Sequence, residues 1–382
     1  MKSKTVFCAV FLFPMAILLV SPAVLVGDGL PSIPAGGLIP LGKTGVAIAK
    51  EVIRISPKKV VVDDAFYNDS DRPVTIEIAF PVPPYYEDID TPPIPSQSFA
   101  DFKLYIEGKP ASFKKKVRAT LGEKGKDITE ILTADKIDIP SFGHLGEANH
   151  RTVAPDIERL PKAEQERLKA MGLIGSDDFD LVGAWTVHMQ FQWTQTFTAH
   201  ATVHIHYEYT PAAGYESAER DIFRLLSDYY EGKVDWVAAI EARDVSKTLT
   251  DFCADPTFVR NAERQIVSAG RPENESATPF YWVDYTLTAD DKWKQGIGDF
   301  TLIVEPDNPD GETGTSQTGD FVMKGWHQLI SFCLPDEALG KVETLDGNRL
   351  QVHLTGFIPD KDLHIGFFDA PLPKSPASDN KK

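Results

Sequence analysis

Hydrophobic and polar residues alternate along several stretches in the first third of the chain. This period-2 alternation is typical of β-strands that bury one face and expose the other. It is clear over residues 46–55, 60–66 and 74–80, and a shorter stretch follows at 102–106. Residues 68–73 read Asn-Asp-Ser-Asp-Arg-Pro, a run of turn-forming types, so we expect the strands on either side of it to form a hairpin.

The longest alternation covers residues 185–194 and 201–209. Aromatic and aliphatic residues occupy one face of both segments, and threonine, histidine, glutamine and glutamate predominate on the other. The pattern predicts a second antiparallel hairpin with one buried and one solvent-facing side. In such a hairpin His188 lies across from Glu208, and His206 lies one diagonal step away.

Other parts of the chain have helical character. Residues 163–171 are rich in Glu, Lys and Arg and end at Gly172, so we interpret the region from about 121 to 180 as a partly helical insertion between strands. Further on, the spacing becomes helical from Ser217, and another helix is expected over 255–268, with an aspartate as its N-cap. Strands return over four short stretches, at 281–287, 300–304, 350–354 and 363–367.

The fold class that we expect is mainly β with an α+β part. Residues 27–211 would form a β-sandwich-like domain that carries the insertion, and residues 212–370 a mixed α+β domain. Residues 371–382 are mostly polar and are expected to be a disordered tail. A single large β-domain is the alternative to this two-domain division. No sequence repeat of solenoid or propeller length is visible.

The N-terminus has the layout of a secretory signal peptide. Lys2 and Lys4 precede an apolar run over residues 6–20, and small residues follow it. We expect residues 1–26 to be removed on export; the alternative is an uncleaved membrane anchor, which the two prolines of the segment disfavour. No other stretch of the sequence is apolar enough to cross a membrane. The predicted location is therefore the periplasm or the extracellular space.

Composition and charge narrow the class of partner. With 42% hydrophobic and 25% charged residues, the chain has the composition of an ordinary globular protein with a core. Its formal net charge is −17, and removal of the two lysines within residues 1–26 makes it −19. So acidic a chain repels nucleic acid and anionic lipid surfaces, and neither is expected as a partner.

Export also determines how the cysteines are interpreted. Cys8 lies within the predicted signal, which leaves Cys253 and Cys333 as an even pair in an oxidising compartment. A disulfide between them would close a loop of roughly 80 residues and add about 4.5 kcal/mol of stability in the chain-entropy model. A redox or metal pair is the alternative, but the sequence has no C-x-x-C spacing.

Several short blocks of sequence occur in a characteristic order. The first are Gly36-Gly37-Leu38, Glu51–Ser56, Phe66-Tyr67-Asn68 and Ala79–Pro83. The later ones are Gln195-Thr196-Phe197 with Tyr209-Thr210-Pro211, Gly298-Asp299-Phe300 and Ser331-Phe332-Cys333. With these blocks the chain resembles a bacterial exported family, the domain of unknown function 4424, over most of its mature length. The resemblance implies export and a largely β architecture, and it brings no activity and no catalytic residues.

The solvent-facing side of the 185–209 hairpin is the best candidate for chemistry. His188, His206 and Glu208 would place two imidazoles and a carboxylate around a divalent metal, zinc first. That arrangement would suit an exported metal-dependent hydrolase. The alternative is a polar sheet face without a metal, since no H-E-x-x-H or similar spacing supports the trio. No other cofactor is expected.

No motif in the sequence assigns a catalytic residue. Nucleophile-elbow, P-loop and dinucleotide-binding glycine patterns are absent. Asp63 and Asp64 are adjacent in a predicted strand and therefore point to opposite faces, which prevents them from acting as a carboxylate pair. Without such a motif, an enzyme is a weaker interpretation than a binding protein.

An exposed loop is expected at residues 81–98, a stretch with six prolines. Tyr85 and Tyr86 lie in it, and tyrosines flanked by prolines and acids suit contact with a protein or a carbohydrate. We therefore hypothesise first a non-catalytic exported binding or interaction protein. Two alternatives stay open: the metal-dependent hydrolase, and a structural accessory of an envelope or secretion assembly.

Overall fold

The computed structural model describes most of the chain between residues 35 and 371. The described residues are 35–86, 99, 101–121, 125–141, 155–176, 181–219, 228–233, 252–268, 277–287, 293–294, 296–307, 326–333 and 341–371. The predicted signal peptide and, apart from Pro371, the predicted C-terminal tail lie outside these residues. Within them, no helix is both long and apolar enough to cross a membrane.

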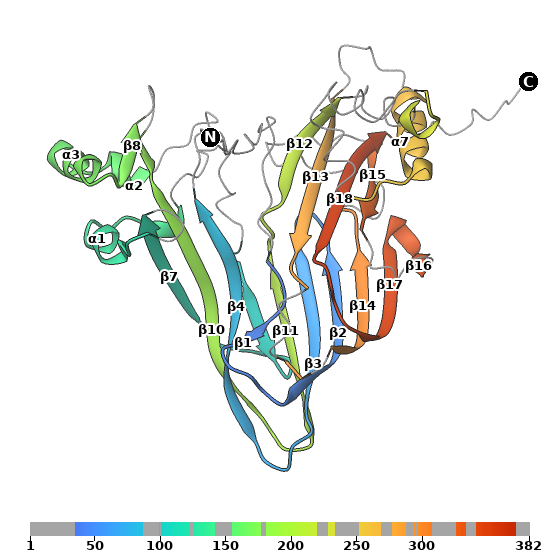
Figure 1. Ribbon diagram of the computed structural model, residues 1–382, viewed down its shortest axis with the longest axis horizontal. Coiled ribbons are helices and arrows are strands. Elements are labelled where there is room, and N and C mark those ends of the chain that lie inside the picture. The colour runs from blue at the N-terminus through green and yellow to red at the C-terminus, as the bar shows by residue number, and fades with distance from the viewer. Residues whose placement is uncertain are drawn as a thin grey trace, which may run out of the picture.

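The protein is mostly β, and within the described ranges its strands form three larger sheets and one small pair (Figure 1). The first sheet has the order β1 (Ile39–Pro40), β4 (Val74–Tyr86), β10 (Trp185–Phe197), β7 (Lys114–Leu121). The eight-stranded sheet has the order β16 (Val342–Thr344), β17 (Leu350–Phe357), β14 (Ile297–Val304), β2 (Val46–Ile55), β3 (Val60–Asn68), β11 (Ala201–Tyr209), β5 (Lys103–Ile106), β6 (Lys109–Pro110). The third sheet has the order β12 (Gly214–Glu219), β13 (Ala277–Tyr285), β18 (Leu363–Pro371), β15 (Trp326–Phe332), and β8 (Ile174–Ser176) pairs with β9 (Leu181–Gly183).

Both predicted hairpins are wrong. β3 pairs with β11 and β4 pairs with β10, so each of the connections β3–β4 and β10–β11 passes from one sheet to another. The two connections lie together at the bottom of Figure 1, where the first sheet and the eight-stranded sheet meet before they diverge. The first sheet (β1, β4, β10 and β7) is called the four-stranded sheet below, and the sheet of β12, β13, β18 and β15 is called the third sheet. The alternation in sequence could not show this, because an arch between two facing sheets buries one side of each strand just as a hairpin does.

Asn68 holds the two connections together. Its side chain is fully buried, and its Nδ2 donates hydrogen bonds to the backbone oxygens of Arg72 at 3.0 Å and Phe197 at 3.0 Å. Its Oδ1 accepts hydrogen bonds from the amide and the hydroxyl of Ser70. These contacts satisfy backbone groups in both turns, which are otherwise distant in sequence.

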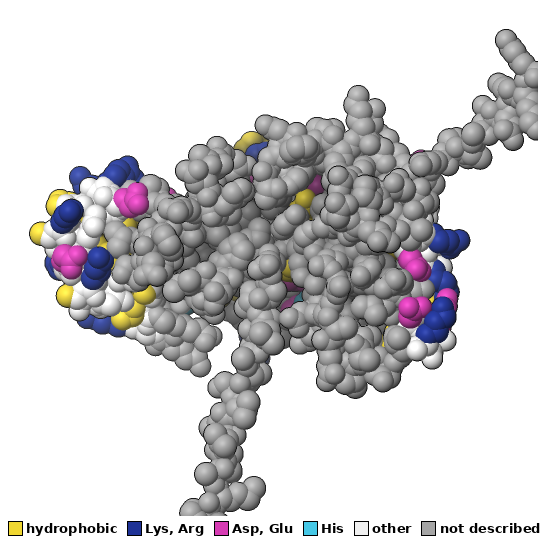
Figure 2. Space-filling view, turned by 90° about the horizontal axis from the view of Figure 1, so that it is seen from above, with side chains coloured by type: hydrophobic (Ala, Val, Ile, Leu, Met, Phe, Trp, Pro, Cys, Tyr) yellow, Lys and Arg dark blue, Asp and Glu magenta, His cyan; other side chains and the backbone are white. Residues whose placement is uncertain are grey.

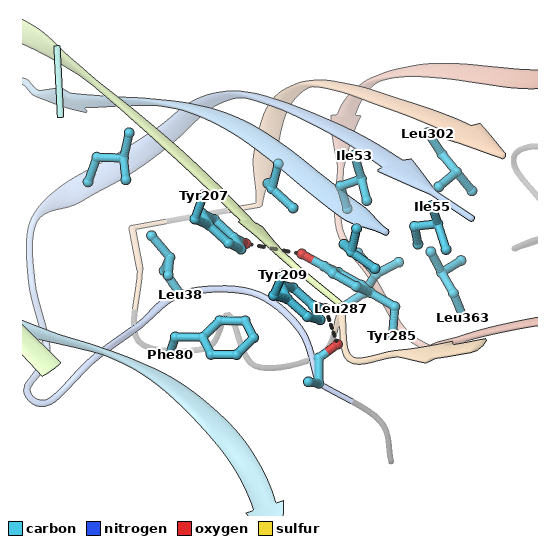
Figure 3. Packing of buried hydrophobic residues seen from close by; sticks show 14 of the residues in the cluster. Leu38, Ile53, Ile55, Phe80, Tyr207, Tyr209, Tyr285, Leu287, Leu302 and Leu363 are labelled. Carbon is cyan, nitrogen blue, oxygen red and sulfur yellow. Dashed lines mark hydrogen bonds between the residues drawn. The ribbon is translucent and has the colours of Figure 1, made fainter. Parts of the chain in front are cut away.

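The main hydrophobic core lies between the sheets and is rich in aromatic rings. Phe80 of β4 lies 4.9 Å from Tyr209 of β11, measured between ring centroids, which is a contact across the two sheets. Tyr209 donates a hydrogen bond to the carbonyl of Ala35, and the hydroxyls of Tyr207 and Tyr285 lie 3.2 Å apart (Figure 3). The tyrosines therefore pack as hydrophobic side chains while each polar end finds a partner.

The eight-stranded sheet contains strands from both sides of residue 211. β14 lies parallel to β2, with Phe300 in register with Glu51, and β17 and β16 continue the sheet beyond β14. The sheets therefore do not follow the expected division into residues 27–211 and 212–370. That division stays a prediction about units of folding.

Three short helices lie between β7 and β10 in the chain: α1 (Thr129–Ala134), α2 (Pro155–Glu158) and α3 (Lys162–Ala170), with a 3-10 turn at Ile139–Ser141. Their buried side chains form a second hydrophobic cluster with the upper part of β10, where Trp185 and Val187 are buried. The inner face of β10 thus packs on the opposite sheet at one end and on these helices at the other.

The described C-terminal half contains α7 (Pro256–Ser268) and a 3-10 turn at Asp346–Asn348. The predicted N-cap of α7 is confirmed, because Asp255 accepts a hydrogen bond from the amide of Phe258 at 2.7 Å. The helix expected from Ser217 is wrong at its start, since Ser217 lies in β12 and pairs with β13. Residues 220–227 of that expected helix lie outside the described residues.

The predicted cysteine pair is joined in the structure. The Cα atoms of Cys253 and Cys333 lie 5.0 Å apart and a disulfide connects their sulfurs across a sequence separation of 80 residues. Cys253 lies just before α7 and Cys333 just after β15, so the bridge attaches the helix to the third sheet. The hydroxyl of Ser331 donates a hydrogen bond to the carbonyl of Phe252 beside it.

Candidate functional site

The outer face of the eight-stranded sheet carries the best-defined cluster of polar side chains. Neighbouring strands β3, β11 and β5 contribute Asp63, His206 and Tyr105 in one row, because His206 is in register with both of the others. The alternation of each strand turns these side chains away from the core, whereas the adjacent Asp64 is only 4% exposed. Asp63 and Asp64 therefore point to opposite faces, as the sequence predicts.

Asp63 fixes the orientation of His206. Its Oδ1 lies 2.7 Å from Nδ1 of the imidazole, and its Oδ2 accepts a hydrogen bond from Nη1 of Arg54 at 2.9 Å. Burial raises the pKa of Asp63, but the hydrogen bonds from His206 and Arg54 outweigh it and hold the pKa below its ordinary value. Because an ionised carboxylate only accepts, Nδ1 donates, and the lone pair of the neutral imidazole belongs to Nε2.

Glu208 follows His206 on the same face and is held by two lysines. Its Oε2 lies 2.6 Å from Nζ of Lys59 and its Oε1 lies 2.7 Å from Nζ of Lys103. The hydrogen bonds from Lys103 and then Lys59 lower the pKa of Glu208 to about 2. The carboxylate is 15% exposed and carries its charge at neutral pH.

A hollow of about 640 Å³ lies over this part of the sheet. Tyr105 stands beside the imidazole of His206, with 5.4 Å between the ring centroids and 66° between the ring planes. The described residues that line the hollow are Lys50, Val52, Asp63, Asp64, Ala65, Tyr105, Gly108, His204, Ile205, His206 and Glu208. The hollow thus combines an aromatic ring, a fixed imidazole and the carboxylates of Asp63 and Glu208, which already have cationic partners.

The predicted metal trio is not brought together. His206 and Glu208 lie on the eight-stranded sheet, but His188 lies on the four-stranded sheet, in register with Arg118 of β7. The trio depended on the 185–209 hairpin, which does not form. Among the residues that the structure describes, no group of three His, Cys, Asp or Glu side chains is arranged to hold a metal ion.

His188 has a different environment from the one expected. Its Nε2 lies 3.0 Å from the hydroxyl of Thr120. Burial and the neighbouring Arg118 guanidinium lower its pKa, so the imidazole is neutral at pH 7. It acts there as a hydrogen-bonding group of the four-stranded sheet.

Tyr85 and Tyr86 belong to a strand rather than to a loop. They are the last residues of β4 and are in register with Val187 and Thr186 of β10. Proline is tolerated at this end because β1 pairs with β4 only near Ala79, which leaves the other edge of β4 without a partner in the described strands. Residues 87–98 and the side chains of both tyrosines lie outside what the structure describes, so the contact role predicted for them stays a prediction.

Sequence reasoning identified His206 and Glu208 as a polar pair on one face but missed their partners. Asp63, Lys59 and Lys103 are more than 100 residues away in sequence, and only the register of β3, β11 and β5 brings them close. One signal could have identified Asp63: the alternation of β3 places it on the outer face, as the alternation of β11 does for His206. This signal becomes informative only when β3 is paired with β11 and not with β4.

Comparison with known proteins gives seven matching chains of solved structure and one family. The chain aligns with a crystal structure from Legionella pneumophila described as a "putative nutrient binding protein", at 15% sequence identity and a TM-score of 0.41. The alignment covers 89% of this chain and 72% of that one. No curated protein matches the chain.

The family model for a domain of unknown function, DUF4424, matches residues 28–312. That span holds all strands of the first sheet, β2, β3, β5, β6, β11 and β14 of the second, and the whole of the hollow. The match agrees with the resemblance carried by the short sequence blocks. The chain belongs to the DUF4424 family.

Proposed function

We propose that this chain is an exported, non-catalytic binding protein whose ligand occupies the hollow on the outer face of the eight-stranded sheet. The observation that carries the proposal is the fixed imidazole of His206, held by Asp63 beside the ring of Tyr105. A polar group oriented by a second residue, next to an aromatic surface, is how binding sites position a ligand. The N-terminal pattern and the disulfide support export.

The paired carboxylates of the hollow argue against a cationic ligand. Asp63 is neutralised by Arg54, and Glu208 is held by two lysines, so neither carboxylate needs a cation from the ligand. Tyr105 offers an apolar ring, and Nε2 of His206 and the carboxylates offer acceptors for hydroxyl protons. A saccharide has both an apolar face and several hydroxyls, and we take it as the ligand class.

The geometry gives less support to a hydrolase. Metal chemistry would need a third ligand beside His206 and Glu208, and His188 is on the other sheet. Among the described residues that line the hollow, none is Ser, Thr or Cys, so no alcohol or thiol nucleophile stands beside the imidazole. In the proposed binding protein, the two facing sheets form a sandwich-like scaffold that supports the hollow. Residues 121–180 add a helical element at one end of this scaffold.

Saccharide binding can be tested directly on the mature protein secreted with its own signal. A panel of neutral mono- and oligosaccharides, read by saturation-transfer NMR, identifies a binder, and calorimetry then measures its affinity. Tyr105→Ala and His206→Ala should each weaken that affinity by about tenfold or more. Tyr67→Ala is the control, because Tyr67 is an exposed tyrosine of the same sheet that does not line the hollow.

Three results would count against different parts of the proposal. If no neutral saccharide in the panel binds at millimolar concentration, the ligand class is wrong. If one binds but both hollow variants keep the wild-type affinity, the site is wrong. Binding that falls equally in Tyr67→Ala would show that the loss is not specific to the hollow.

A further inference from the structure

Strand β7 forms the outer edge of the four-stranded sheet and carries a row of cations. Lys114, Lys116 and Arg118 are exposed and occupy alternate positions, so their side chains share one face of the strand. The register places Lys116 beside Gln190 and Arg118 beside His188 on the neighbouring strand β10. Alternate residues of a strand are about 6.6 Å apart, so the row extends over about 13 Å.

None of these three cations forms an ion pair in the part of the chain that the structure describes. This is unusual for a chain with a formal net charge of −17. Elsewhere lysines and arginines find carboxylates: Lys59 and Lys103 share Glu208, and Arg167 binds Asp135 and Glu164. At the end of the molecule that carries α1, α2 and α3, basic and acidic side chains lie side by side (Figure 2).

The backbone edge of β7 is also open where the cations lie. Its upper part is covered, because the amide of Ile128 donates to the carbonyl of Ala119 and the amide of Leu121 donates to the carbonyl of Lys126. Over residues 114–118 no described strand pairs with the outer edge. Beside this edge lies a hollow of about 1170 Å³ lined by β4, β7, β10 and residues 126–131, which include the first turn of α1.

Lysine on an edge strand often serves only to prevent edge-to-edge aggregation. Such a row repels a basic strand, but it attracts an acidic one. Carboxylates at alternate positions of an added strand would lie directly opposite the three cations, and opposite charges in such pairs stabilise strand pairing. The protective role and a selective docking role therefore differ in what they predict for an acidic peptide.

We propose that the edge of β7 at residues 114–118 binds an extended acidic segment of a partner protein by strand addition. Main-chain hydrogen bonds to the open edge would supply affinity, and carboxylates at alternate positions, facing Lys114, Lys116 and Arg118, would supply specificity. This surface lies on a different sheet from the saccharide hollow and is independent of it.

Two synthetic peptides of equal composition test the proposal on the full mature protein. One alternates Asp and Val, and the other has its Asp residues first and its Val residues last. At low ionic strength, fluorescence anisotropy should show that the alternating peptide binds at least about fivefold more tightly. N-methylation of its backbone on the pairing side should abolish binding, because the edge would lose its hydrogen bonds.

Two charge-reversal variants locate the surface. Lys116→Glu should weaken binding of the alternating peptide by about tenfold or more, since it replaces the central cation of the row. Lys115→Glu makes the same change in net charge on the opposite face of β7 and should weaken it by less than about threefold. Circular dichroism confirms that both variants are folded. Equal affinity for the two peptides, equal losses in the two variants, or no binding at all would overturn the proposal.

Discussion

Replacing Glu208 with glutamine keeps the shape of the side chain and removes the charge that Lys59 and Lys103 share. A pKa of about 2, against the ordinary 4.5, corresponds to about 3.4 kcal/mol for a fully shielded carboxylate. The two lysine side chains are 52% and 55% exposed, so water and salt screen both pairs. We therefore expect Glu208→Gln to lower the free energy of unfolding by about 1–2 kcal/mol at pH 7.

The pH dependence of this loss has a definite sign. The folded-state pKa lies below the unfolded-state value, so the stabilisation is complete above about pH 4.5 and disappears as the pH falls toward 2. Urea unfolding at pH 7 and at pH 3, followed by tryptophan fluorescence, measures both values. Glu343→Gln, at an exposed glutamate of β16, is the control and should change stability little. A loss for Glu208→Gln that is the same at both pH values would refute the reasoning.

Three further predictions concern the scaffold. Asn68→Ala should lower the unfolding free energy by about 2–4 kcal/mol, because it leaves buried carbonyls of both turns without donors. Chemical denaturation measures this loss, and a value below about 0.5 kcal/mol would contradict the prediction. Replacing Cys253 and Cys333 together with alanine should cost about 2–4 kcal/mol, and adding reductant to the double variant should then change nothing. Tyr285→Phe should cost about 1 kcal/mol through loss of the buried hydroxyl contact, and a stabilised variant in thermal unfolding would show that this contact contributes nothing.

Local sequence signals predicted most of the individual elements. The strands now seen at β2, β3, β10 and β11 follow the alternation, and Asp255 at the start of α7 follows the rules for helix caps. These signals act over a few residues, so they can be read without knowledge of the partner. The cysteine pair was predictable for another reason, since only two cysteines remain outside the predicted signal peptide.

The pairing of strands was not predictable in the same way. Alternation specifies which face of β3 or β10 is buried, and it does not specify whether the next strand returns beside it or crosses to the facing sheet. Asn68 is the residue that distinguishes the two cases, because its buried amide serves carbonyls in both turns. An asparagine before a turn, however, also favours the turns of hairpins.

The same limit explains what was missed in the site. His206 and Glu208 could be placed on one face from sequence, but Asp63, which orients the imidazole, reaches it only through the β3–β11 register. His188 was assigned to the site because it belongs to the adjacent segment of chain. It lies on the other sheet because the chain crosses over near residue 200.

The most direct test of the proposed binding site is a crystal structure of the mature protein with the saccharide that the panel identifies. We expect a sugar ring packed against Tyr105, with one of its hydroxyls donating a hydrogen bond to Nε2 of His206 while Nδ1 keeps its contact with Asp63. Density for the sugar at any other place, with the outer face of the eight-stranded sheet unoccupied, would contradict the account.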